Sequence, residues 1–139
     1  MYKPKHFALH ELVDPQIYEI IGENAWKLLN EGALKTLDQL RDKFGALYVN
    51  TWYRGGSYKE SGLRRANTNT GSSRSQHRVG CAFDCKFKNA DIEEVYQYIL
   101  ENQQDFPYIK RIENISATPT WLHFDVKETG QSEIYVFNP

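Results

Sequence analysis

Apolar residues in the first third of the chain recur at helical spacing and predict two helices. Asp14 and Pro15 are typical of a helix start, because aspartate caps free N–H groups and proline suits the first helical position. This short helix should end near Gly22, and the longer helix that follows is interrupted or offset around Gly32. The apolar face of the longer helix consists of Ala33, Leu34, Leu37, Leu40 and Phe44. Gly45 stands where a left-handed residue commonly closes a helix.

Later in the chain, alternation of apolar and polar positions predicts strands. In the run 81–87 the odd positions are cysteine and phenylalanine, whereas the even positions place Asp84 beside the small Ala82. A helix should follow from Asp91, which resembles a capping box with Glu94. The other expected strands are Leu47 to Trp52, Arg111 to Ser116, Thr120 to Val126, and Glu133 to Phe137. Helices first and strands later predict an α+β fold, with N-terminal helices packed on a small antiparallel sheet.

Composition and charge restrict the class of protein. The 139 residues are 40% hydrophobic and 25% charged, which fits one globular domain spanning residues 1–139. A net charge of −1 and the lack of a basic-aromatic pattern argue against nucleic acid or an anionic membrane as partner. No apolar run approaches the ~18 residues of a membrane span. We expect a monomer.

The first seven residues lack the apolar region of a secretory signal. We therefore expect a protein made in the cytoplasm. An extracytoplasmic target would be reached after release, as on cell lysis, or as part of a phage particle.

The two cysteines, Cys81 and Cys85, are four positions apart in a strand-like run. At a rise of roughly 3.3 Å per residue they would be about 13 Å apart, too far for a disulfide. They are read as small buried residues, with a spare metal or redox site as the alternative.

Residues 54–74 have a different composition, with four glycines separated by serine, asparagine and threonine. Loops of about twenty residues inside a small domain are usually functional or disordered. Because this segment runs directly into His77, we interpret it as a binding loop.

Three residues are candidate ligands of a metal ion: His77, Asp84 and His123. Catalytic zinc typically takes about three protein ligands of these types and leaves a fourth position open. His6 and His10, in the N-terminal segment, are read as ordinary surface or core residues.

Strand geometry allows these ligands to converge. In the run 120–126, His123 shares a face with Trp121 and Asp125, opposite the apolar Leu122 and Phe124. His77 and Asp84 differ by an odd number of positions, so on one unbroken strand they would face opposite sides. Gly80 between them offers the turn or bulge that brings both to one side.

The pattern Ser-x-His-x-x-Gly-x-Ala-x-Asp, followed by Trp-x-His, resembles the zinc D-alanyl-D-alanine carboxypeptidase (VanY-like) family. This family includes phage endolysins of the L-alanyl-D-glutamate type and is akin to the hedgehog signalling domain. The matching residues are Ser75, His77, Gly80, Ala82, Asp84, Trp121 and His123. Residues 50–54 also resemble the family's strand ending in an aromatic residue and an arginine. The resemblance covers nearly the whole chain.

The resemblance implies a hedgehog-like or D,D-peptidase-like fold and hydrolysis of peptide bonds in the peptidoglycan stem. It implies that His77, Asp84 and His123 bind Zn2+ and that the fourth position holds the attacking water. Arg54 would lie near the site, where a guanidinium holds a substrate carboxylate or stabilises an oxyanion. Trp121 would wall the cleft. Ser75 is placed on the substrate side or serves as a turn residue bonded to nearby backbone.

One position departs from the family pattern. Where much of the family has a glutamate acting as general base, three residues before the last histidine, this chain has Thr120. Asp125 is the nearest substitute by sequence, although it would equally suit a group that orients His123. Glu113 and Glu128 are remoter options.

This departure leaves two other functions open. One is a non-catalytic wall-binding or virion module that keeps the zinc site. The other is a zinc-free globular protein whose histidines are incidental.

Overall fold

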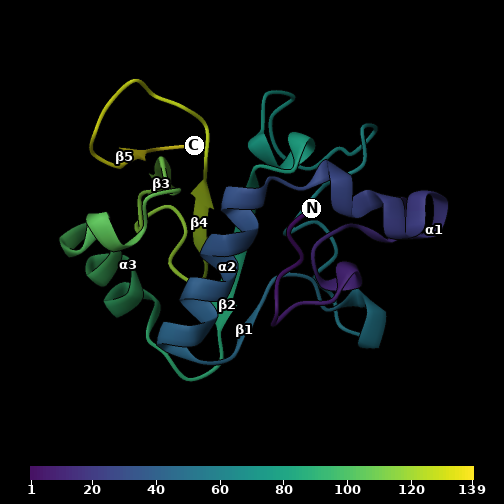
Figure 1. Ribbon diagram of the computed structural model, residues 1–139, viewed down its shortest axis with the longest axis horizontal. Coiled ribbons are helices and arrows are strands. Elements are labelled where there is room, and N and C mark those ends of the chain that lie inside the picture. The colour runs from purple at the N-terminus through teal and green to yellow at the C-terminus, as the bar shows by residue number, and fades with distance from the viewer.

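The computed structural model describes residues 1–139 and combines three α-helices with one five-stranded sheet (Figure 1). The helices are α1 (Pro15–Ile21), α2 (Glu31–Phe44) and α3 (Ile92–Glu101). The strands are β1 (Leu47–Tyr48), β2 (Ala82–Phe87), β3 (Arg111–Glu113), β4 (Leu122–Asp125) and β5 (Tyr135–Phe137). Short 3₁₀ helices are η1 (Leu9–Glu11), η2 (Gly22–Leu28), η3 (Trp52–Arg54), η4 (Gln76–Val79) and η5 (Gln103–Asp105). The predicted α+β class is confirmed.

The sheet has the strand order β1-β2-β4-β3-β5. The pairs β1–β2, β2–β4 and β3–β4 are antiparallel, whereas β3–β5 is parallel. The prediction of a wholly antiparallel sheet is therefore wrong at this edge. After β4 the chain reverses direction through residues 126–134 and crosses over β3 to its far edge. β5 therefore runs antiparallel to β4 and parallel to β3.

Side-chain caps set the helix starts much as the sequence predicts. Asp14 accepts a hydrogen bond from Ile17 N at 2.9 Å, and Gly22 ends α1 with φ +60°. Asn30 accepts from Ala33 N at 3.0 Å and so starts α2 before Gly32. The interruption expected around Gly32 therefore lies before Asn30, where η2 separates α1 from α2. Gly32 itself lies inside α2.

The strand predicted from Leu47 to Trp52 is shortened to β1. Asn50 leaves the sheet because its N–H donates to Glu11 O at 2.9 Å and its side-chain amide donates to Val13 O at 2.9 Å. These bonds tie the chain after β1 to the N-terminal segment instead of to β2.

One hydrophobic core fills the space between the helices and one face of the sheet. The sheet contributes Phe83, Ile112 and Phe124, which are fully buried. Figure 1 shows α2 in front of β2 and β4, with α3 beside them. The alternate positions of β2 and β4, including Asp84 and His123, project to the opposite face.

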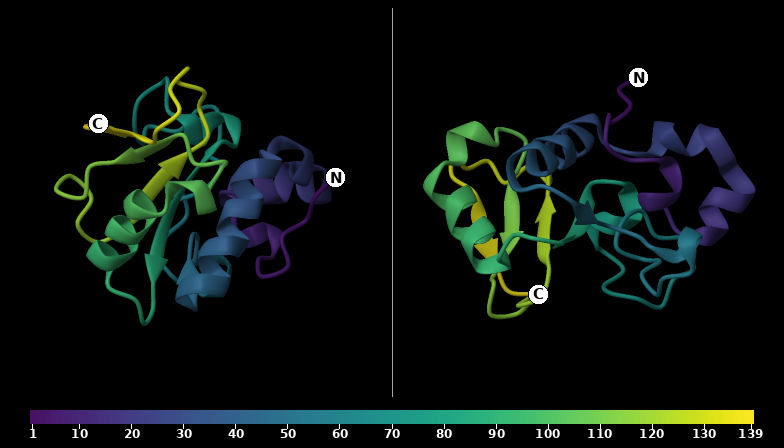
Figure 2. Two further views of the ribbon diagram at one scale, coloured as in Figure 1. Left: turned by 60° about the vertical axis from the view of Figure 1, so that its left-hand side comes forward. Right: turned by 90° about the horizontal axis from the view of Figure 1, so that it is seen from below.

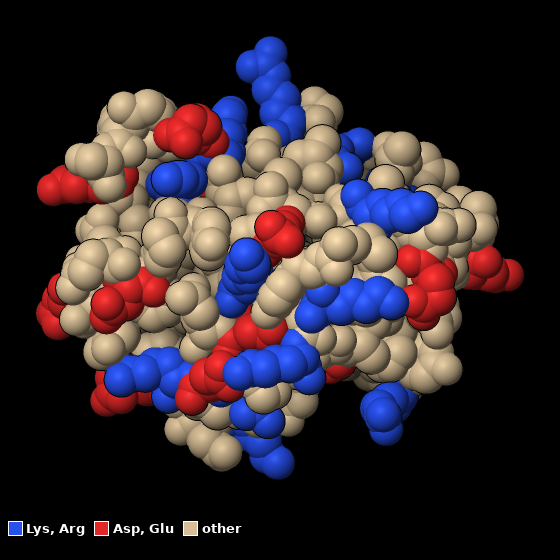
Figure 3. Space-filling model, in the orientation of Figure 1, with Lys and Arg blue, Asp and Glu red and all other residues tan.

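The remaining segments gather at the other end of the molecule. Figure 2 shows the strands and α3 at one end, and α1, the N-terminal segment and the loop after β1 at the other. Figure 3 shows lysine and arginine side chains interspersed with aspartate and glutamate over one face. None of the helices has the length and apolar character required to cross a membrane.

Candidate metal centre

Three segments bring the predicted ligands together. Asp84 and His123 are direct partners in the antiparallel β2–β4 pair, so their side chains leave the same face of the sheet side by side. His77 comes from η4, where its backbone N–H donates to Ser75 Oγ at 3.2 Å. Gly80 closes η4 in the left-handed conformation, with φ +73°, and turns the chain into β2.

Gly80 is required at this turn for two reasons. Its φ lies in a region that L side chains rarely adopt. A Cβ atom there would also lie 2.0 Å from the carbonyl oxygen of Leu28. The predicted convergence of His77 and Asp84 therefore depends on a glycine turn rather than on a bulge within the strand.

The ligand atoms have the spacing of a metal site. His77 Nε2 lies 3.2 Å from Asp84 Oδ1 and 3.3 Å from His123 Nδ1, and the last two atoms are 2.9 Å apart. Tetrahedral zinc with bonds of 2.0–2.1 Å separates its ligands by about 3.3 Å. Two imidazole nitrogens and one carboxylate oxygen are also donors that zinc prefers. The donor set therefore fits a zinc ion.

The other nitrogen of each imidazole is held by a hydrogen bond. His77 Nδ1 lies 3.0 Å from the carbonyl oxygen of Gly62, and His123 Nε2 lies 3.1 Å from Asp125 Oδ2. Both partners are acceptors, so both outer nitrogens carry the proton and donate. The inner nitrogens of the two rings therefore present lone pairs to the centre, as metal ligation requires.

The carbonyl of Gly62 is placed by the N-terminal segment. Leu63 N donates to Leu12 O at 2.8 Å, and Asp14 N donates to Leu63 O at 3.0 Å. This contact is so close that a Cβ on Gly62 would lie 2.1 Å from the Leu12 oxygen. The N-terminal segment thus supports His77 by fixing the Gly62–Leu63 backbone.

Asp125 lies behind His123, on the side away from Asp84. It is fully buried, and Arg111, its direct partner across β3–β4, binds both of its oxygens at 2.9 and 2.8 Å. Of the two roles considered for Asp125, this geometry supports orientation of His123.

The electrostatics of the cluster favour a bound cation. Burial opposes the charge on Asp84, but the two imidazoles outweigh it and lower the pKa of Asp84. Burial also opposes charge on His123, yet hydrogen bonds to Asp125 and Asp84 raise the pKa of His123 to about 9. The carboxylates around His123 therefore favour positive charge at this position.

The centre opens into a cleft of about 440 Å³. Its basic lining residues are Arg64, Arg74, Arg111 and Lys127, and Asp84 and Glu113 are its acidic ones. Arg64 is only 8% exposed, and its Nη2 lies 3.6 Å from Asp84 Oδ2. Arg64 is not among the residues predicted for the site; its one signal in the sequence is a basic residue in the glycine-rich loop leading to His77.

Of the residues expected on the substrate side, the structure brings Ser75 and Trp121 to the cleft but not Arg54. Arg54 is exposed at the end of η3 and lines a separate hollow of about 340 Å³ with His10 and Tyr53. The reason is the turn at η3, after which residues 58–64 carry the chain back toward the ligands. Arg64 therefore occupies the place expected for Arg54.

The two cysteines are unpaired, and Cys85 is fully buried in the core. Cys81 is partly exposed, and burial together with nearby Asp125 raises the pKa of its thiol. Neither cysteine belongs to the group of candidate metal ligands.

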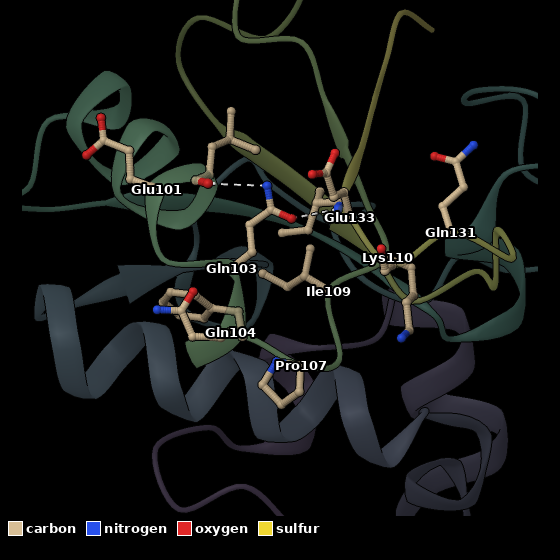
Figure 4. A pocket seen from close by; sticks show the side chains of 12 residues that line it. Glu101, Gln103, Gln104, Pro107, Ile109, Lys110, Gln131 and Glu133 are labelled. Atoms are coloured by element: carbon tan, nitrogen blue, oxygen red, sulfur yellow. Dashed lines mark hydrogen bonds between the residues drawn. The ribbon is translucent and has the colours of Figure 1, made fainter.

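A second hollow, of about 460 Å³, lies between the end of α3 and the approach to β5 (Figure 4). It is slightly larger than the cleft at the metal centre but holds no cluster of ligating side chains. The Gln103 amide at its centre is bonded at both ends, to Leu100 O at 3.2 Å and to Ile134 N at 2.8 Å. The chemistry therefore lies with the His77, Asp84 and His123 cleft.

Comparison of the chain with protein-family models, with curated proteins and with solved structures finds no match.

Proposed function

We propose that this protein is a zinc-dependent peptidase that hydrolyses peptide bonds of bacterial cell-wall peptidoglycan. The observation that carries the proposal is the convergence of His77, Asp84 and His123 with both outer imidazole nitrogens held by acceptors. This arrangement, with the three ligand atoms within 4.8 Å of one another, supports a metal site. Peptidoglycan as substrate rests on the resemblance of the 75–84 and 121–123 segments to zinc carboxypeptidases and endolysins.

The chain's own residues supply the scaffold for this chemistry. A zinc ion bound here would polarise the scissile carbonyl and lower the pKa of a water molecule. Gly62 and Asp125 hold the two imidazoles in the ligating orientation, and Arg111 holds Asp125 in turn. The cleft of about 440 Å³, which Trp121 lines, leaves room for the peptide.

The basic rim of the cleft suits an anionic peptide. Arg64, Arg74 and Lys127 line it, and neither Arg74 nor Lys127 forms a salt bridge with the protein's own carboxylates. Peptidoglycan stem peptides carry free carboxylates, which arginine binds in charge-assisted hydrogen bonds. We assign to Arg64 the substrate-holding role expected of Arg54.

The test is digestion of purified peptidoglycan by the zinc-loaded protein, followed by assay of new amino termini and mass spectrometry of the muropeptides. We expect new amino termini with the native chain and none with His77→Ala or Asp84→Ala, which should also lose stoichiometric zinc. His10→Ala is the matched control, because His10 stacks on Tyr53 away from the centre. Undiminished digestion by a zinc-free variant would overturn the proposal.

A second candidate function is a non-catalytic wall-binding or virion module that retains zinc. Thr120, at the position where a catalytic glutamate is expected, favours it. The same experiment separates the two, because the module would bind zinc and sediment with peptidoglycan while releasing no new amino termini.

A further inference from the structure

Peptide hydrolysis needs a group that accepts a proton from the attacking water. Position 120, where a glutamate is expected for this role, holds a threonine. Thr120 is exposed in the turn before β4, and its hydroxyl does not accept a proton usefully near neutral pH. Asp125 faces away from the centre, with its oxygens bonded to Arg111 and His123. Glu128 is exposed, and its carboxylate accepts from backbone N–H groups outside the cleft.

Glu113 is the carboxylate that a third strand brings to the ligands. It ends β3 two positions after Arg111, so both side chains leave the sheet on the face that carries His123. Glu113 Oε1 lies 3.7 Å from His123 Nδ1, the nitrogen that faces the centre. The carboxylate lines the cleft, is 15% exposed, and forms no salt bridge with a lysine or arginine.

Glu113 lies beside the three candidate ligands but is not itself one of them. The ligand atoms of His77, Asp84 and His123 all lie within 4.8 Å of one another, and this group does not extend to Glu113. Its distance to His123 is also longer than the 2.9–3.3 Å that separates the ligands. A carboxylate set back in this way is within reach of a molecule next to the ligands, at about 2.6–3.2 Å.

We infer that Glu113 is the general base of the reaction, an assignment that rests on the proposed peptidase function. Glu113 takes one proton from the attacking water as the water oxygen forms its bond to the peptide carbonyl carbon. It then gives this proton to the leaving nitrogen as the C–N bond breaks. The products are a carboxylic acid and an amine, and Glu113 returns to the carboxylate form.

The deciding variant is Glu113→Gln, which keeps the shape of the side chain but does not accept the proton. We expect its rate of amino-terminus release to fall by about 10²–10⁴-fold. We expect its zinc affinity, measured by chelator competition, and its cobalt-substituted absorption spectrum to stay as in the native chain. Glu128→Gln is the matched control and should keep the native rate.

The outcomes separate this inference from the proposed function. A native chain that releases no amino termini overturns both. An active native chain with an equally active Glu113→Gln variant overturns the general-base role alone. Loss of zinc affinity and a changed cobalt spectrum in Glu113→Gln would make Glu113 a ligand and also overturn the role. Denaturant unfolding of each variant shows whether a lost rate comes from an unfolded chain.

Discussion

Asp84 and His123 lie directly opposite each other across the β2–β4 pair, with Asp84 Oδ1 2.9 Å from His123 Nδ1. Because side chains alternate along a strand, a shift of one residue in this register would move one ligand into the core face. The hydrophobic core formed by Phe83 and Phe124 prevents that shift, since both are fully buried in the same register. The packing of the sheet therefore defines the metal centre.

We predict that Asp125→Asn weakens zinc binding by about 10–100-fold, because the amide has no charge and only one acceptor oxygen, for which the donors of Arg111 and His123 compete. Competition with a chelator of known affinity measures the change. Asp105→Asn, at an exposed position in η5, is the control and should bind as the native chain does. Native affinity in Asp125→Asn would show that His123 is oriented by packing alone.

Gly80→Ala should destabilise the protein far more than Gly130→Ala. Both glycines have nearly the same φ, +73° and +74°, so both substitutions carry a similar backbone strain of about 1–2 kcal/mol. Only at Gly80 does the added Cβ meet a neighbour, the carbonyl oxygen of Leu28, whereas nothing lies within 4 Å at Gly130. We expect Gly80→Ala to cost about 1–3 kcal/mol more in denaturant unfolding. Equal losses would argue against a close contact between the Gly80 turn and Leu28 of η2.

Glu60 makes the stability of the loop 54–74 depend on pH. Burial opposes its charge, but hydrogen bonds from Thr68 and Thr70 and the nearby Arg65 outweigh it and lower the pKa of Glu60 below 4.5. A carboxyl group with a lowered pKa in the folded state stabilises the protein above the unfolded pKa. This contribution is lost as the pH falls through the folded value.

The variant that removes this charge is Glu60→Gln. We expect it to lower the free energy of unfolding by about 1–2 kcal/mol near neutral pH. The difference from the native chain should shrink as the pH falls below 4.5. Urea unfolding at several pH values measures it. A difference that stays constant with pH would mean that the charge of Glu60 does not hold the loop.

Arg64 and Arg54 give opposite expectations for peptidoglycan digestion. Arg64→Ala should lower the rate about tenfold or more, because the guanidinium lies in the cleft 3.6 Å from Asp84. Arg54→Ala should leave the rate unchanged, because Arg54 lines a different hollow. Unfolding measurements on both variants exclude a general loss of structure. The reverse result would assign substrate binding to Arg54.

The sequence by itself determined the local features of this protein. Apolar periodicity and caps such as Asp14 and Asp91 located the helices, because these signals act within a few residues. Alternation along 81–87 and 120–126 separated the buried face from the face carrying Asp84 and His123 for the same reason. The spacing of His77 and Asp84 and the later His123 indicated a metal site, and the structure brings these three candidate ligands together.

Only the tertiary structure decided which distant residues surround that site. Arg64 rather than Arg54 reaches the cleft because Leu63 bonds to the N-terminal segment, a contact across some fifty residues that no local pattern encodes. Glu113 lies beside His123 because β3 pairs with β4, and β5 lies parallel to β3 because the chain passes over that strand. Periodicity describes each strand alone, whereas strand order and loop anchoring arise from long-range hydrogen bonds and packing of the whole chain.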